Sequence, residues 1–155
     1  MNPVLAISLG IVLLLGIVLF FRSRVASEWD ISSEDIPKVI SKLKAASPSP
    51  AWAQILAVTS LDESNSGVAL DYLVANGQLE FNWCLLGQKN IEDKLVLIDF
   101  FNQNGFSNAE IVAKNGCPLI QVTGANIEGL ANRILTEIYH VKGPLTLIGE
   151  GFEWP

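Results

Sequence analysis

The first 21 residues of this 155-residue chain contain no charged side chain. The chain is also poor in residues that most site chemistry needs, with one histidine and two cysteines. A single histidine excludes a multi-histidine metal site, and two isolated cysteines cannot form a disulfide framework. There is no CxxC or HExxH motif and no glycine-rich phosphate loop. These absences predict no catalytic residue, no cofactor and no metal.

The charged residues that follow are mostly acidic, 16 against 10, which gives a formal net charge of −6. An acidic protein lacks the basic face that nucleic-acid phosphates require, so nucleic acid is excluded as a partner. The length that remains after the uncharged segment suits one domain of ordinary size.

The uncharged segment, 1–21, is long enough to cross a bilayer, because about 20 apolar residues span its hydrocarbon core. Phe20 and Phe21 end the segment and Arg22 and Arg24 follow it, so these residues are predicted to form a flank at the membrane surface. A cleaved signal peptide is disfavoured, because no basic residue precedes the apolar run and the run is too long. A buried core helix would not need an uninterrupted run of this length.

Lysines and arginines lie only on the C-terminal side of this segment. Positive charge stays in the cytoplasm, so we expect a single-pass protein of the inner (plasma) membrane, with its N-terminus outside and its C-terminal domain cytoplasmic. The predicted organisation is a transmembrane anchor at 1–21, a juxtamembrane linker at 22–33 and a soluble α+β domain at 34–155.

Apolar residues spaced three and four apart predict the helices of this domain. The first spans residues 36–43 and the second begins at Pro50, which suits a first helical turn. A third helix is capped by Asn90 and ends at Gly105, and its predicted buried stripe is Ile91, Leu95, Ile98 and Phe101 or Phe100. The last long helix begins at Asn126.

Two Asn-Gly pairs, Asn76-Gly77 and Asn115-Gly116, predict two hairpins, because tight hairpin turns favour residues that tolerate positive φ. Each hairpin is expected to keep one face apolar, which sets its register. The predicted facing pairs are Tyr72 with Phe81 in the first hairpin and Ile111 with Ile120 in the second.

The element order from Gln78 onward is βαββαβ, which is typical of a ferredoxin-like sandwich with helices on one face of an antiparallel sheet. The strand at 68–74 adds to this sheet. We therefore predict an α+β fold: a single N-terminal transmembrane helix, followed by a ferredoxin-like sandwich with two extra N-terminal helices and one extra strand.

Few residues are candidates for chemistry. His140 ends a helix, where a cation is favoured, so we interpret it as a cap, with proton transfer as the alternative. Cys84 and Cys117 have no histidine near them in sequence, which favours packing residues over thiol nucleophiles. No two carboxylates stand out as an acid–base pair among those considered, which are Asp71, Glu80, Glu92, Asp93 and Asp99.

One face of the predicted sheet carries no helix and mixes polar with aliphatic side chains. Either the two N-terminal helices or another protein covers it. The two aromatic residues at the end of the chain either pack on the core or form an exposed partner-binding tip. The residues predicted to form a partner surface are Leu73, Leu86, Val112, Leu119, Phe152 and Trp154.

The segment from Gln78 to Gly143 carries a family resemblance in its two strand pairs and two helices. One helix ends in Phe101-Asn-Gln-Asn-Gly105-Phe106, and the other contains Leu135-Thr-Glu-Ile-Tyr139. In these features, which cover under half of the chain, the sequence resembles the class I type III secretion chaperone-like domains. The resemblance implies a domain that binds a polypeptide without catalysis, although the predicted anchor departs from those soluble, dimeric chaperones.

Together these patterns predict a non-enzymatic, membrane-anchored interaction protein, an accessory subunit or scaffold of a larger membrane complex with other protein subunits as partners. The alternative is a small-molecule-sensing regulatory domain tethered to the membrane, because ferredoxin-like domains can bind ligands between paired edge strands. A third hypothesis is an enzyme that uses Cys84, Cys117 or His140.

Overall fold

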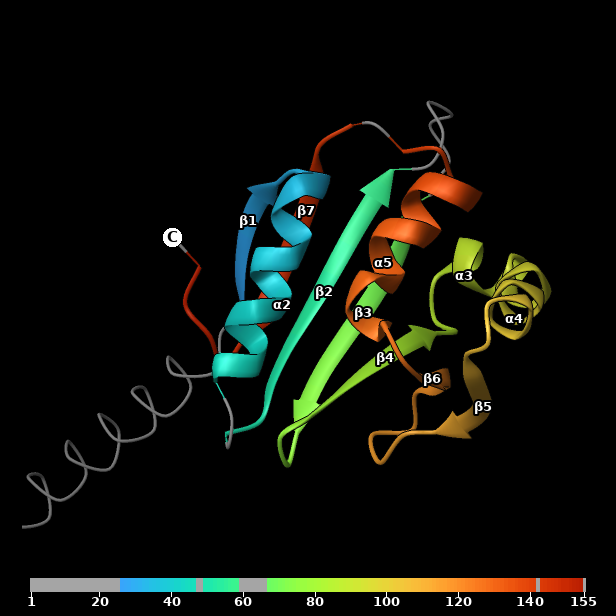
Figure 1. The fold of residues 1–155 in the computed structure, drawn as a ribbon, viewed down its shortest axis with the longest axis horizontal. Helices are drawn as coiled ribbons and strands as arrows, with labels where there is room; N and C mark the ends of the chain where they lie inside the picture. The colour runs from blue at the N-terminus through green and yellow to red at the C-terminus, as the bar shows by residue number, and fades with distance from the viewer. Residues whose placement is uncertain (1–25, 47–48, 59–66, 142, 155) are drawn as a thin grey trace, which may run out of the picture.

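The protein is described by a computed structural model that covers residues 26–46, 49–58, 67–141 and 143–154 (Figure 1). Its centre is a seven-stranded antiparallel sheet with the order β1-β7-β2-β3-β4-β6-β5. The strands are β1 (Ser27–Ile31), β2 (Ala51–Val58), β3 (Gly67–Ala75), β4 (Gln78–Cys84), β5 (Ser107–Val112), β6 (Pro118–Thr123) and β7 (Leu145–Glu150). The helical elements are η1 (Ser33–Asp35), α2 (Ile36–Ala45), α3 (Gln88–Glu92), α4 (Lys94–Gln103), η2 (Ile127–Gly129), α5 (Leu130–Arg133) and the π-helix η3 (Ile134–Ile138).

The core lies between one face of the sheet and the helices. In Figure 1, α2 and α5 lie over the central strands, and α3 and α4 lie towards the end of the sheet that carries β5. Helices α2, α4 and α5 all bury side chains in the same cluster as the strands. At its centre Phe81 contacts Tyr72 and Phe101 edge to face, with ring centroids 5.2 and 6.2 Å apart. One-sided covering leaves the opposite face of the sheet, here called the open face, without a helix from the described residues.

None of the helices in the described ranges is long and apolar enough to cross a membrane. The longest, α2 and α4, have 10 residues each, whereas a span needs about 20. This finding contradicts the predicted single-pass protein of the inner membrane with a membrane as partner, and we withdraw that prediction. The segment 1–21 on which it rested, with its flank of Phe20, Phe21, Arg22 and Arg24, lies outside the described residues.

The predicted ferredoxin-like sandwich with two extra N-terminal helices is also wrong. The helix expected from Pro50 is instead β2, in the middle of the sheet, and β1 forms within the segment predicted as a linker. The last strand, β7, pairs with β1 and β2, neither of which was predicted to be a strand. The molecule is a mixed α+β structure built on one large antiparallel sheet.

The first hairpin has the predicted register, since Tyr72 pairs with Phe81. The second is displaced by one residue, so that Ile111 pairs with Leu119 and not with Ile120. The cause is the turn, because Ala113 N–H donates to the Cys117 carbonyl oxygen at 2.9 Å and closes a three-residue loop. Gly116 takes the left-handed conformation, with φ 84°, that such a loop requires.

Strands β3 and β4 separate beyond the pair Asp71–Asn82, and β4 continues along β6. The side chain of Asn90 fills the opening. Its Oδ1 accepts from Ala69 N–H at 3.2 Å, and its Nδ2 donates to the carbonyl oxygens of Ala69 and Cys84 at 3.0 and 2.9 Å. Asn90 was predicted to cap a helix, but it is 1% exposed and takes the place of a neighbouring strand.

Replacing Asn90 with alanine should lower the free energy of unfolding by about 2–4 kcal/mol, because each buried polar group left without a partner costs about 1–3 kcal/mol. Urea denaturation at neutral pH would measure the loss. The matched control is Asn104→Ala, which removes an exposed side chain that donates to the Phe100 carbonyl oxygen. The control should cost less than about 1 kcal/mol, and equal losses in the two variants would contradict this role for Asn90.

Candidate interaction surfaces

A polar row crosses the central strands on the open face. Gln54 pairs with Asp71, Asp71 with Asn82, and Asn82 with Gln121. Gln54 Nε2 donates to Asp71 Oδ1 at 2.8 Å, and Gln121 Nε2 donates to Glu80 Oε2 at 2.9 Å. Two enclosed acceptors, Asp71 Oδ2 and Asn82 Oδ1, receive no hydrogen bond of normal geometry from the described residues. The centre of this face is therefore rich in acceptors and short of donors.

Among the described residues positive charge is absent from the open face, whereas acidic side chains lie on both sides of the sheet. The register places five acidic side chains on the open face, namely Glu28, Asp30, Asp71, Glu80 and Glu150. The lysines and the arginine of the described residues lie instead on helices or in the β5–β6 turn, at Lys38, Lys42, Lys44, Lys89, Lys94, Lys114 and Arg133. The open face would therefore repel an acidic surface.

The open face brings Asp71 and both cysteines together, but it does not activate them. Burial raises the pKa of Asp71, and hydrogen bonds from the Cys84 thiol and Gln54 only partly oppose this. Burial, followed by the nearby charge of Asp71 and a contact with Cys117, raises the pKa of the Cys84 thiol. The thiolate is the nucleophilic form, so this environment disfavours attack by Cys84.

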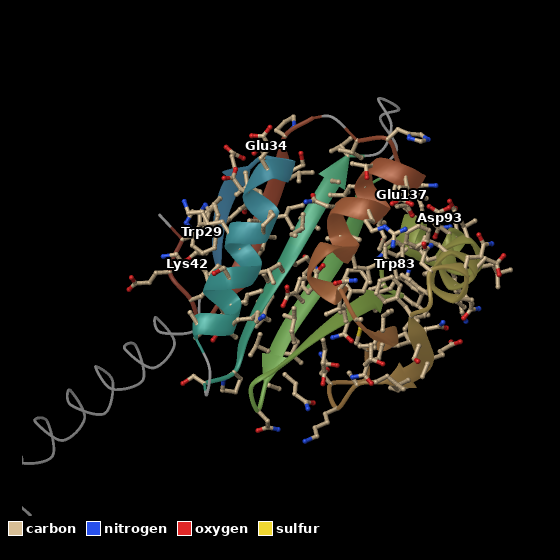
Figure 2. The ribbon with its side chains drawn as sticks, viewed as in Figure 1. Trp29, Glu34, Lys42, Trp83, Asp93 and Glu137 are labelled. Carbon is tan, nitrogen blue, oxygen red and sulfur yellow. The ribbon has the colours of Figure 1, made fainter. Side chains whose placement is uncertain are left out.

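The predicted candidates on the helices also have structural partners. Tyr139 donates to Asp93 Oδ2 at 2.8 Å and stacks on Trp83 with ring centroids 6.4 Å apart. Figure 2 shows Trp83 and Asp93 in the region between α5 and α4. Burial, followed by the bond to Asp93, raises the pKa of Tyr139. His140 lies after η3 with φ 51°, and its Nδ1 is 2.9 Å from the Thr136 carbonyl oxygen. Within the described ranges no set of three or more His, Cys, Asp or Glu side chains is arranged to hold a metal ion.

The structure separates the residues predicted to form one partner surface. Leu73 is half-buried on the open face, and Leu119 lies on the same face but is only 6% exposed. Leu86 and Val112 are strongly exposed, at 69% and 70%, towards the β5 end of the sheet. Of these four residues, only the last two are freely accessible apolar side chains.

The C-terminal tail packs on the core and does not form an exposed tip. Trp29 pairs with the core residue Leu147 and so faces the helices, and the ring of Phe152 lies 5.9 Å from it. Trp154 lies beside α2, with Lys38 Nζ 5.0 Å from the centre of its ring. Phe152 and Trp154 therefore lie on the side of the sheet opposite to Leu73.

Exposed apolar residues gather in one segment. All the large hydrophobic side chains that are exposed in the described structure, apart from Val58, lie between Leu86 and Val112. Helix α4 contacts β5, and an ion pair between Lys94 and Glu110 joins the two elements. We call this set the apolar corner, and its members are Leu86, Ile91, Leu95, Val96, Ile111 and Val112. The corner extends over both faces of β5, because Ile111 points to the open face, opposite Leu119, and Val112 points to the side of the helices.

Sequence reasoning missed the helical part of the apolar corner, because it assigned Ile91 and Leu95 to the buried stripe of one helix. The signal was present in the consecutive apolar residues 95–98. A surface helix with one buried face carries a single stripe, so an unbroken apolar run must expose some of its members. Leu97 is fully buried, whereas Leu95 is 72% exposed.

A separate groove of about 340 Å³ lies between α2 and η2. Lys44 and Glu128, which line it, form an ion pair with each other. Lys44 and Glu128 neutralise each other, so this pair offers a ligand no unpaired charge. The small-molecule-sensing hypothesis stays a prediction, and no site in the described structure is favoured for it.

Replacing Asp71 with asparagine should change how stability depends on pH. Because burial raises its pKa in the folded state, the native chain holds this proton more tightly than the unfolded chain. The stability from this proton is complete below about pH 4, the unfolded value, and is lost as the pH rises through the folded value. The stability of Asp71→Asn relative to the native chain should therefore increase with pH, as measured by urea denaturation from pH 4 to 8. A difference that stays flat would contradict the pKa argument.

Cys84 should react slowly with iodoacetamide at pH 8, because its raised pKa keeps the thiol protonated. Mass spectrometry of the Cys84 peptide would compare the folded chain with the chain in urea, and we expect slower labelling when folded. Asp71→Asn should speed the labelling of folded Cys84, since it removes the neighbouring negative charge. Equal rates in folded and unfolded protein would exclude this account of the thiol.

Comparisons of the chain with protein-family models, with curated proteins and with solved structures find no match. The resemblance to class I type III secretion chaperone-like domains therefore stays a prediction.

Proposed function

We propose that this chain is a non-catalytic protein-binding domain, which contacts another protein through the apolar corner and serves as a subunit or scaffold of a larger assembly. The observation that carries the proposal is the concentration of exposed apolar side chains between Leu86 and Val112. Burying one large apolar side chain stabilises by about 1.5–3 kcal/mol. Single exposed residues need no explanation, whereas a clustered set is typical of an interaction site.

The surroundings of the apolar corner support binding. Lys89 pairs with Asp93 at 2.8 Å, and Lys94 pairs with Glu110, so charged pairs border the apolar side chains. Protein interfaces commonly have an apolar centre with a polar rim. Because these charges already have partners within the chain, a protein that covers the corner would not leave them buried and unpaired.

The titratable groups support binding more than catalysis. Burial raises the pKa of Tyr72, as it does for Cys84 and Tyr139, which favours the neutral form of each. Tyr72 is occupied by the fold, since its hydroxyl donates to the Ile127 carbonyl oxygen and accepts from Ala131 N–H, both at 3.0 Å. A thiol or phenol nucleophile is activated by a lowered pKa or by an adjacent base, which is the opposite of this environment.

Site-specific photocrosslinking in intact cells would test the proposal. A benzophenone side chain placed at Val112 should form a covalent product with another polypeptide, because this position lies in the apolar corner. The same group at Lys42, exposed on α2 away from the apolar corner (Figure 2), should not. Products at both positions, or at neither, would contradict the proposal.

A second variant tests whether the apolar contact itself drives binding. Leu95→Ser should reduce the Val112 product about tenfold, since about 1.4 kcal/mol of lost apolar burial corresponds to tenfold in affinity. Val58→Ser is the matched control, because Val58 is 71% exposed but lies outside the apolar corner. A similar effect of the two substitutions would argue against the corner as the contact.

A further inference from the structure

The two edges of the sheet are protected to different degrees. At one edge β1 carries Glu28 and Asp30, and the tail residue Phe152 packs against its Trp29. At the other edge every residue of β5 except Asn108 is exposed, and the strand contains neither lysine nor proline. Proteins usually guard an edge strand with charge, proline, a bulge or a covering segment, because unpaired backbone groups attract another strand. Edge β5 has one charged side chain, Glu110, and it is paired with Lys94.

The hydrogen bonds of the hairpin show which backbone groups of β5 have no strand partner among the described residues. Ala113 N–H donates to Cys117 on the side of β6, and the register continues with Ile111 opposite Leu119. Backbone groups of an antiparallel strand alternate in direction. The N–H and C=O groups of Asn108, Glu110 and Val112 therefore point away from β6 and towards the edge.

We propose that β5 pairs antiparallel with β5 of a second copy of this chain, about a two-fold axis at Ile111, so that the two sheets become continuous. The proposal rests on the proposed function, because it names a second copy as the partner of the apolar corner. A two-fold axis makes the contact self-complementary and closes the assembly at a dimer.

The register follows from charge and from the direction of the backbone groups. An axis at Glu110 would place two carboxylates directly opposite, which destabilises a strand pair. An axis at Ile111 places Glu110 opposite Val112 of the second copy, and both residues have backbone groups that point to the edge. Ile111 then meets Ile111 of the second copy as a non-hydrogen-bonded pair, in which Cα atoms are about 4.5 Å apart.

Charge complementarity favours a second copy over an unrelated strand. In this register the diagonal neighbours of Glu110 on the second copy are Lys114 and the other Glu110, both at a distance that long side chains reach across a sheet. Lys114 is exposed and lies two residues beyond the end of β5, in the β5–β6 turn. The two Glu110 carboxylates would then be surrounded by four lysines, Lys94 and Lys114 of each copy, and these outweigh the repulsion between the carboxylates.

Disulfide trapping of the full chain tests the register. In a Cys84→Ala, Cys117→Ala background, Ile111→Cys treated with copper phenanthroline should give a covalent dimer on a non-reducing gel, since the paired Cα atoms lie within disulfide range. Thr123→Cys is the matched control: Thr123 is exposed on β6, on the same face as Ile111, but away from the edge. Faster crosslinking of Thr123→Cys, or of Glu110→Cys, than of Ile111→Cys would overturn the proposal.

Sedimentation of the chain with its native cysteines supplies a second measurement. The native chain should be a dimer, and Ile111→Lys, which places two ammonium groups opposite each other, should weaken dimerisation at least about tenfold with an unchanged circular dichroism spectrum. Ser107→Lys, on the same strand and face but away from the axis, should remain dimeric. A native chain that is monomeric at every concentration overturns the inference. If Val112 then still crosslinks to a different protein, the proposed function stands, and if it crosslinks to nothing, both fail.

Discussion

The side chain of Asn90 holds together the part of the molecule on which its proposed function depends. Strand β4 cannot pair with β3 along its whole length and also turn towards β6, and the separation leaves backbone groups of Ala69 and Cys84 without strand partners. Asn90 satisfies these groups from the first turns of α3. Trp83 then donates its indole N–H to the Asn90 carbonyl oxygen at 2.9 Å. One residue thereby joins β3, β4 and α3, and the apolar corner is built on the elements that follow it.

The sequence predicts an element of this fold well only where a local pattern, such as a turn motif, is compatible with a single structure. Asn76-Gly77 between two alternating strands predicts the first hairpin and its register, because a slip of one residue would mix the faces. The segment 51–58 misleads, because its buried positions, Ala51, Ala53, Ile55 and Ala57, are mostly alanine. Alanine is the best helix former, yet here small side chains alternate beneath the helices in a central strand. No Asn-Gly turn joins this segment to a neighbouring strand in the sequence, so its local pattern does not identify it as a strand. The predicted ferredoxin-like order left this strand out and was therefore wrong.

The exposure of the residues predicted to form a partner surface follows from the sequence only in part, for a comparable reason. Leu86 lies in a turn and Val112 lies on an edge strand. Residues at such positions have few neighbours, and both side chains are exposed. Leu119 has the same chemistry but pairs with Cys84 and Ile111 on either side, and these neighbours enclose it. Sequence spacing assigns a residue to a face of a sheet, but its burial depends on the strands beside it. The sheet order supplied that information, and the sequence pattern alone did not.

The unequal edges connect the fold with the proposed association. A sheet covered on one face must still end at two edge strands, and each edge exposes backbone groups that favour pairing. At β1 the chain itself protects the edge from pairing, because the strand carries acidic side chains and the aromatic tail packs beside α2. At β5 the neighbouring helix α4 is itself partly apolar on its outer side, since Leu95 and Val96 are exposed. If β5 faced only solvent, exposed apolar side chains next to it would not stabilise the protein. Apolar side chains next to free backbone groups are instead the combination that a paired strand requires, and this is why we assign the contact to β5 and not to β1.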